Sequence, residues 1–133
     1  MTNPRDQLSQ RQITRKAIPL EKAHIHDTAI AINTDFLATD LTITPVGPEP
    51  ETVYPPCLFR IMIAIDTAQV FRAHIDDGTT EVALEFNGGI ALAAQSVYIF
   101  DILVNEDDSI NFQVDGAVQI EKFIVQEILW GTQ

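Results

Sequence analysis

Two histidines near the N-terminus are the first residues whose type and spacing suggest chemistry. His24 and His26 are separated by one residue, so on a β-strand both side chains would share a face and could chelate a metal ion. No third ligand lies near them in the sequence, and His74 would have to converge on the pair to form a centre like that of cupin-type jelly-roll enzymes. Two surface histidines are the simpler interpretation, so we predict no metal and no cofactor.

The other candidate catalytic groups lack the partners that catalysis requires. Glu106-Asp107-Asp108 resembles a fragment of a calcium loop, but the bidentate glutamate that ends an EF-hand loop does not follow. Cys57 follows two prolines and has no basic sequence neighbour to lower its pKa, which predicts a structural thiol. No serine has a G-x-S-x-G setting, and nothing singles out one carboxylate pair among the 19 acidic residues. We therefore predict a protein that is not an enzyme.

The size and composition of the chain predict one packed domain. It has 133 residues, of which 46% are hydrophobic, and a single cysteine, which suits a reducing cytosol. No apolar run approaches the ~20 residues needed to cross a bilayer, and the first 16 residues contain no apolar signal segment. We expect assembly in the cytoplasm and no membrane partner.

Most of the chain has a hydrophobic period of two, which is the period of β-strands. The alternating apolar sets are Phe59/Ile61/Ile63/Ile65, Phe71/Ala73/Ile75, Val82/Leu84/Phe86, Tyr98/Phe100/Ile102/Val104 and Ile110/Phe112/Val114. Several short strands separated by turns predict an all-β antiparallel sandwich or barrel, with Phe100, Phe112 and Phe123 in its core.

Turn residues predict how neighbouring strands pair. Asp77-Gly78 suits a two-residue type I′ hairpin loop. The expected cross-strand pairs are then Ala73–Val82 and Phe71–Leu84. A three-residue loop, 115–117, and a loop over 105–109 keep the next apolar sets on one face. Their expected pairs are Val114–Val118, Phe112–Ile120, Val104–Ile110 and Ile102–Phe112, with Gly116 or Ala117 at positive φ.

The N-terminal part of the chain is predicted to be organised differently. Residues 1 to about 22 lack strand periodicity, so we expect an extended N-terminal arm over 1–27 and a sandwich domain over 28–133. Residues 28–46 are expected to add two strands, with a helical turn over 32–39 as the alternative. Residues 45–56 hold five of the seven prolines and predict an extended surface connection.

Charge is distributed unevenly between arm and body. Residues 1–22 contain five basic and two acidic residues (5 − 2 = +3), and the remaining 111 residues contain three basic and 17 acidic ones (3 − 17 = −14). The acidic body would repel nucleic acid, and the arm has no aromatic residue for base stacking. The arm therefore favours an acidic protein partner. The expected interface residues are Arg5, Arg11, Arg15, Lys16 and Lys22, with Trp130 near the other terminus.

The C-terminal third, "ALAAQSVYIFDILVNEDDSINFQVDGAVQIEKFIVQEI", resembles the terminal strands of small β-sandwich virion proteins of tailed bacteriophages, particularly head decoration (cement) proteins. The resemblance covers residues 90–130. An aromatic-rich strand, Tyr98–Ile102, precedes a polar turn; a strand containing Ile110-Asn111-Phe112 follows; and the last strand ends in the V-x-E-I of Val125–Ile128.

This resemblance implies a jelly-roll-like sandwich, a homotrimer, that binds the major capsid protein on the outside of a virion and performs no catalysis. The basic arm would then reach a neighbouring subunit. Two alternatives remain open from sequence: a carbohydrate- or receptor-binding jelly-roll module of a tail or fibre, which requires an exposed aromatic platform, and the cupin-type enzyme with a histidine metal centre.

Overall fold

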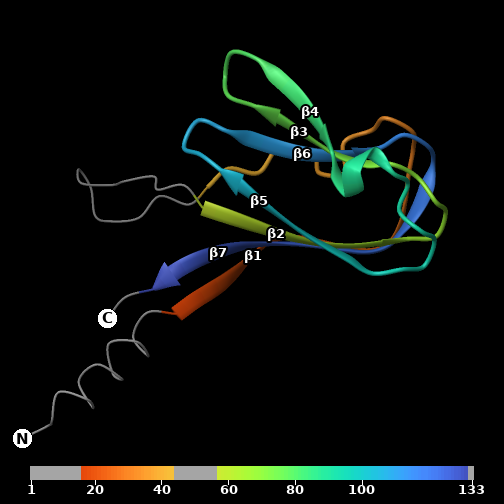
Figure 1. The fold of residues 1–133 in the computed structure, drawn as a ribbon, viewed down its shortest axis with the longest axis horizontal. Coiled ribbons are helices and arrows are strands. Elements are labelled where there is room, and N and C mark those ends of the chain that lie inside the picture. Colours follow the sequence, from red (N-terminus) through yellow and green to blue (C-terminus); the bar gives the residue numbers. More distant parts are fainter. Residues whose placement is uncertain (1–15, 44–56, 132–133) are drawn as a thin grey trace, which may run out of the picture.

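The protein folds into two antiparallel β-sheets that pack face to face (Figure 1). The computed structural model describes residues 16–43 and 57–131. The elements are β1 (Lys16–Ile30), β2 (Cys57–Ile65), β3 (Phe71–Asp76), β4 (Glu81–Glu85), the 3₁₀ turn η1 (Phe86–Gly89), β5 (Tyr98–Val104), β6 (Ser109–Val114) and β7 (Val118–Gly131). Sheet A has the order β1-β7-β2-β5 and sheet B has the order β4-β3-β6. The predicted all-β antiparallel sandwich is confirmed.

Aromatic side chains fill the space between the two sheets. Phe59, Phe71, Phe112 and Phe123 have no exposed surface, and each such ring contributes about 2 kcal/mol of burial free energy. The rings of Phe112 and Phe123, from opposite sheets, have centroids 5.1 Å apart. Phe100 is half-buried and stacks on Phe86 at 4.8 Å. The three phenylalanines that we expected in the core therefore belong to it or line its margin.

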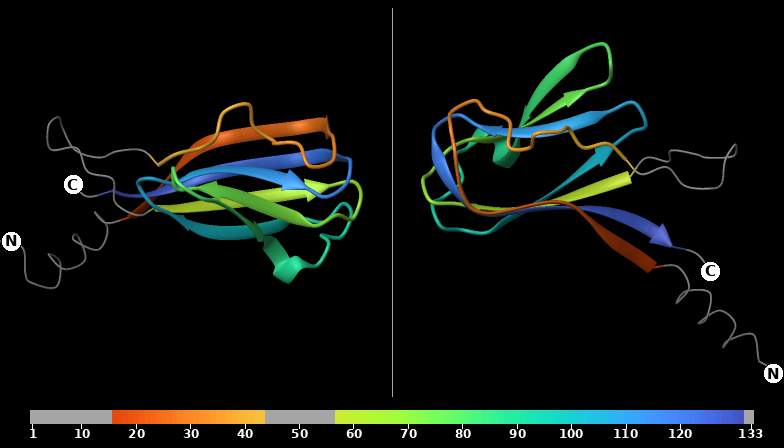
Figure 2. Two further views of the ribbon diagram at one scale, coloured as in Figure 1. Left: turned by 90° about the horizontal axis from the view of Figure 1, so that it is seen from above. Right: turned by 180° about the vertical axis from the view of Figure 1, so that it is seen from behind.

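The alternating pattern correctly predicts which face of β2 and β3 is apolar. In β2, Phe59, Ile61, Ile63 and Ile65 are buried while Arg60 is exposed. In β3, Phe71 and Ala73 are buried, and Ile75 packs against the same core. In β4, however, Val82 and Leu84 are 47% and 48% exposed although they share a face with Ala73 and Ile75. The β3–β4 hairpin flares away from sheet A, so part of its inner face reaches solvent (Figures 1 and 2).

The predicted register of the β3–β4 hairpin is wrong by two residues. Leu84 opposes Ala73 and Val82 opposes Ile75, and residues 77–80 form the loop. The physical reason is the loop's own hydrogen bonding. The Asp77 carboxylate accepts bonds from the backbone N–H groups of Thr79 and Thr80 at 2.9 and 2.8 Å, which moves the tip to Gly78-Thr79. The shift preserves the parity of the strand, so the apolar sets still share one face.

The predicted pairings of β5 with β6 and of β6 with β7 are also wrong. The connections over 105–108 and 115–117 are as short as expected, but each crosses from one sheet to the other. Phe112 opposes Ala73 rather than Ile120, and Val104 opposes Cys57 rather than Ile110. Neither Gly116 nor Ala117 has a positive φ. When the chain crosses between the sheets, the apolar faces of the two strands pack against each other in the core. The same alternation of apolar residues would also suit two strands paired side by side in one sheet.

The first strand contains much of the predicted arm. Residues 16–27 belong to β1, which pairs with β7 from Lys16–Gly131 to Ile30–Val118. The domain boundary that we placed at residue 28 therefore falls inside a strand. Residues 1–15, and the proline-rich connection over 45–56, lie outside the described residues.

Between Ile30 and residue 43, where the description of this segment ends, the two expected strands are not formed. After β1 ends at Ile30, the described part of this segment runs irregularly along the edge of β6. Backbone N–H groups of Asn33, Phe36 and Leu41 donate to carbonyls of β6 at 3.0, 2.8 and 2.9 Å. The segment thus provides hydrogen-bond partners for the backbone carbonyls at this edge of sheet B, although it is too irregular to be a strand.

Candidate interaction surfaces

The end of sheet A brings together two of the predicted interface residues. β7 pairs with β2 only as far as Ile128, whereas its pairing with β1 continues to Gly131. Residues 16–18 and 129–131 therefore form a two-stranded extension beyond β2, which we name the projecting ribbon (Figure 1). In its ladder Lys16 opposes Gly131 and Ala17 opposes Trp130, so Lys16 and Trp130 lie one position apart on adjacent strands.

The basic residues that precede the projecting ribbon are Arg5, Arg11 and Arg15, which lie outside the described residues. Arg15 immediately precedes the first residue of β1, so this basic segment joins the sandwich at the projecting ribbon. With Asp6 as its only acidic residue, the segment 1–15 carries a net charge of 3 − 1 = +2. The basic segment is thus continuous in sequence with the strand that pairs with the C-terminal strand at Trp130.

Lys22, the remaining predicted interface residue, faces an internal partner. A β-bulge between Glu21 and Ala23 gives β1 an extra residue there, and the Lys22 ammonium lies 3.9 Å from a carboxylate oxygen of Glu127. The Lys22 side chain is 19% exposed, and that of Glu127 is completely buried. Sequence reasoning missed this pair. Its one signal was a glutamate at an inward position of β7, two residues after Val125.

Cys57 completes this buried polar cluster. Its thiol donates a hydrogen bond to Glu127 Oε2 at 3.3 Å. Burial, reinforced by the hydrogen bond and the charge of Glu127, raises the pKa of Cys57 to about 12. A thiol with that pKa is almost fully protonated at neutral pH and is a poor nucleophile. The geometry agrees with the structural role that the sequence predicts for Cys57.

The three histidines do not converge on a common site. His24 and His26 share the outer face of sheet A, as their spacing predicts, where His24 lies 3.6 Å from Glu21. His74 lies on sheet B and contacts Glu81 at 2.8 Å. No group of three or more histidine, cysteine, aspartate or glutamate side chains in 16–43 and 57–131 could hold a metal ion. The histidine centre of a cupin-type enzyme is therefore not assembled by these residues.

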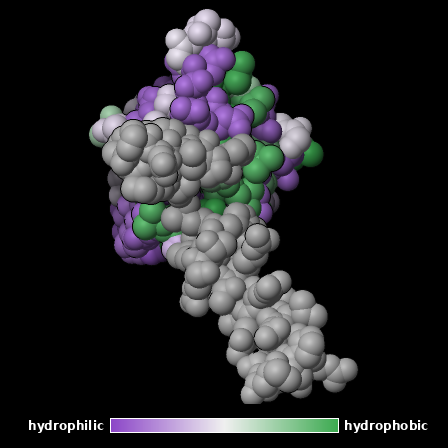
Figure 3. Space-filling model, turned by 90° about the vertical axis from the view of Figure 1, so that its left-hand side faces the viewer, coloured by the Kyte–Doolittle hydropathy of each residue, from purple (hydrophilic) through white to green (hydrophobic). Residues whose placement is uncertain are grey.

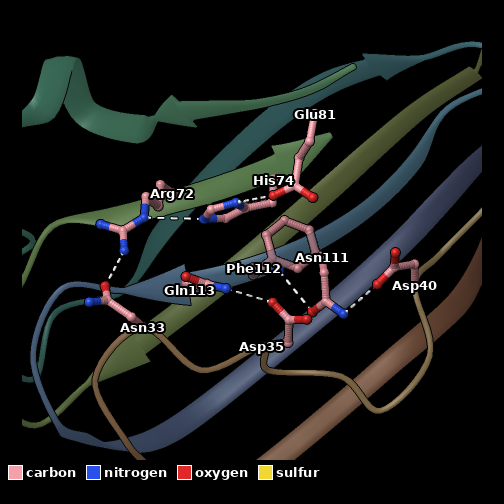
Figure 4. A network of polar contacts seen from close by, with 9 residues as sticks. All are labelled: Asn33, Asp35, Asp40, Arg72, His74, Glu81, Asn111, Phe112 and Gln113. Atoms are coloured by element: carbon pink, nitrogen blue, oxygen red, sulfur yellow. Dashed lines mark hydrogen bonds and ion pairs between the residues drawn. The ribbon is translucent and has the colours of Figure 1, made fainter. Parts of the chain in front are cut away.

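A network of polar side chains covers the outer face of sheet B (Figure 4). Asn111 is buried. Its side-chain oxygen accepts a hydrogen bond from the N–H of Leu37, and its side-chain NH2 group donates to the carbonyl of Leu37 and to the carboxylate of Asp40, the last at 2.7 Å. Gln113 donates to Asp35 at 2.7 Å, and Arg72 donates to both Asn33 and His74. The bonds of Asn111 and Gln113 attach the segment over 35–40 to β6, and the bond of Arg72 attaches Asn33 to β3, which indicates a structural role.

The outer face of sheet A is more apolar than that of sheet B. Leu103, Val97 and Ile99, on or next to β5, are 69%, 66% and 62% exposed. A depression of about 130 Å³ lies beside them, lined by Arg60, Met62, Ile99, Ile124 and Gln126. Arg60 makes a two-pronged ion pair with Asp101 at 2.9 and 3.1 Å across the same face. Exposed apolar side chains around a neutralised ion pair are typical of a protein-binding surface.

Exposed apolar surface also occurs on the flared hairpin. Figure 3 shows hydrophobic surface next to the hydrophilic tip of β3–β4. The exposed apolar side chains are all aliphatic, because none of the aromatic side chains in 19–43 and 57–128 is exposed. The aromatic platform that a carbohydrate-binding module needs is thus not found in this part of the chain.

The chain matches no protein-family model, no curated protein and no solved structure. Within the described ranges, no helix has the length and hydropathy that a membrane crossing requires.

Proposed function

We propose that the protein is a non-enzymatic virion component that decorates and stabilises the outside of a bacteriophage capsid by binding the major capsid protein. The resemblance of residues 90–130 to head decoration proteins suggests this role. The observation that carries it is the arrangement at the end of sheet A, where the projecting ribbon joins Lys16 and Trp130 to the basic segment 1–15. We expect the sandwich domain to be jelly-roll-like.

The capsid contact is made by a shorter segment than the arm predicted from sequence. Residues 19–27 are held in the body of sheet A, so residues 1–15 and the projecting ribbon remain for the partner. Fifteen extended residues reach about 50 Å, far enough to span from one capsid subunit to the next. Their positive charge selects an acidic groove, while the acidic remainder of the molecule is repelled from such a groove and stays outside it.

Quantitative mass spectrometry of virions purified from the virus whose genome encodes the chain tests the role directly. A decoration protein is present in a fixed ratio to the major capsid protein, and the ratio persists through density-gradient purification. Recovery of the protein only from the infected-cell lysate, with none on the particles, contradicts the proposal. Presence at a few copies per particle instead points to a tail or fibre.

A truncation lacking residues 1–15 tests the contact itself. The sandwich of this variant should fold, because β1 begins at Lys16, but its binding to particles stripped of the protein should fall at least about tenfold and lose most of its salt dependence. A matched control replaces Glu106, Asp107 and Asp108 by glutamine, which changes charge in the turn after β5. This control should bind particles as the wild type does. Unchanged binding by the truncated protein contradicts the assigned contact.

A further inference from the structure

The four edge strands of the sandwich differ in how well they are protected from pairing with another chain. Unprotected edges present unpaired N–H and C=O groups, and natural proteins block them with proline, lysine, bulges, charges or covering segments. The edge of β1 has Pro19 and the bulge beside Lys22. The edge of β6 is covered by the segment over 33–41. The edge strand β4 has only five residues, and both Glu81 and Glu85 are exposed.

Within residues 16–43 and 57–131, the edge of β5 has only one of these protections, a single charged residue. Its seven residues, YIFDILV, include no proline, lysine or glycine, and its pairing with β2 runs without a bulge. It forms the margin of sheet A opposite β1 (Figure 2). Its one charged residue, Asp101, is neutralised by Arg60. On the outer face Ile99 and Leu103 are 62% and 69% exposed.

We propose that β5 pairs antiparallel with β5 of a second copy of this chain, with the two-fold axis passing at Asp101. Ile99 of each copy then opposes Leu103 of the other, and each exposed aliphatic side chain gains an aliphatic neighbour. Moving the register by two residues would place Asp101 opposite Ile99 or Leu103 instead. Moving it by one would turn the apolar set of one copy to the opposite face.

Under this register like charges oppose each other at the axis, and the ion pair within each copy offsets their repulsion. The two Asp101 carboxylates meet at the axis, and each is already paired with its own Arg60 at 2.9 Å. The central row therefore alternates from one guanidinium through two carboxylates to the other guanidinium, with a net charge of zero. The self-complementary feature is the match of exposed Ile99 with exposed Leu103, and a two-fold interface places the same patch on both sides, so the occupant is another copy of this chain.

The dimer makes one continuous sheet from two copies of sheet A. In sheet A, Ile124, Met62 and Ile99 oppose one another in a row across β7, β2 and β5. This row continues into Leu103 and Leu58 of the second copy, which lie side by side on β5 and β2. Ile124, Met62 and Ile99 of this row also line the depression on the outer face of sheet A. The inference does not depend on the capsid role, and a dimer differs in mass from the trimer that the resemblance implies.

Sedimentation equilibrium of the purified full-length protein tests the dimer. We expect twice the monomer mass at about 100 µM, with dissociation on dilution toward the micromolar range. Ile99→Lys and Leu103→Lys should each raise the dissociation constant by about tenfold or more, because lysine on an edge strand blocks pairing. Ile32→Lys is the matched control: Ile32 is 55% exposed but lies after β1, and this variant should dimerise normally. A monomeric or trimeric wild type, or dimeric lysine variants, would overturn the proposal.

A cysteine at the axis tests the register. Asp101→Cys places identical thiols opposite each other, so mild oxidation should give a covalent dimer that is reversed by a reductant. Cys57 is buried and can be left in place. Glu81→Cys, on the protected edge strand β4, should form no covalent dimer under the same oxidation. A dimer that forms without cross-linking at residue 101, or that cross-links equally at residue 81, rules out pairing centred on Asp101.

Discussion

The two strands of the β3–β4 hairpin have similar alternating sequences but very different surroundings. β3 lies between β4 and β6, and Phe71 and Ala73 have no exposed surface. β4 is an edge strand whose five residues are all exposed, including Val82 and Leu84. Both strands present an apolar face on the same side of sheet B. Alternation thus identifies the apolar face of a strand, while neighbouring strands and the opposite sheet decide whether that face is covered.

Phe71→Ala should give the largest effect on stability, because β3 is the covered strand. The ring centroid of Phe71 lies between 4.8 and 6.4 Å from those of five other phenylalanines. Removing the ring leaves a cavity among them and should lower the free energy of unfolding by about 3–5 kcal/mol. Urea denaturation followed by circular dichroism measures the loss. A loss below about 1 kcal/mol would contradict the described packing of this core.

Glu127→Ala tests whether a buried charged side chain matters more to stability than an exposed one. The change removes a buried carboxylate that contacts Lys22 and Cys57, and it should destabilise the protein by about 3 kcal/mol. Glu85→Ala, on exposed β4, is the matched control and should change the stability by less than about 0.5 kcal/mol.

A double variant separates the ion pair from simple packing at Glu127. Replacing both Lys22 and Glu127 with methionine removes both charges but keeps comparable side-chain volume, so it should recover most of the stability lost in Glu127→Ala. The free energies of unfolding of the single and double variants measure the recovery. Equal losses in the two variants would show that the carboxylate stabilises the fold through contacts other than that with Lys22.

The sequence predicts the apolar faces well because each depends only on the local period of two. It cannot predict which strand lies beside which. Phe112 and Ile120 were expected to be cross-strand neighbours, yet they lie in opposite sheets, since short loops permit either pairing or crossing. The pairing of β1 with β7 joins residues about a hundred positions apart and leaves no local signal. For the same reason the proximity of Lys16 to Trp130 could not be predicted.

Leu84→Ala should have a much smaller effect than Phe71→Ala, although both residues belong to the apolar face of one hairpin. Leu84 is 48% exposed, so truncation creates no enclosed cavity and should change the free energy of unfolding by less than about 0.5 kcal/mol. The same urea titration measures both variants. A loss above about 2 kcal/mol would mean that β4 is covered in solution, for instance by association of the flared hairpin with another chain.

The smallest effect is expected at the loop that joins β3 and β4. Hydrogen bonds from the N–H groups of Thr80 and Thr79 lower the pKa of Asp77 from its ordinary value of 3.8, because they favour the charged carboxylate. The stabilisation is therefore fully present above about pH 4 and is lost as the pH falls through the lowered pKa. Asp77→Asn should weaken these bonds at neutral pH and remove the acid-induced change. NMR titration of the Thr79 and Thr80 amide resonances follows both effects. Because the loop is exposed and β4 is already uncovered, the thermal unfolding midpoint should stay nearly unchanged, and a large shift would show that the turn organises more of the sandwich than its own hairpin.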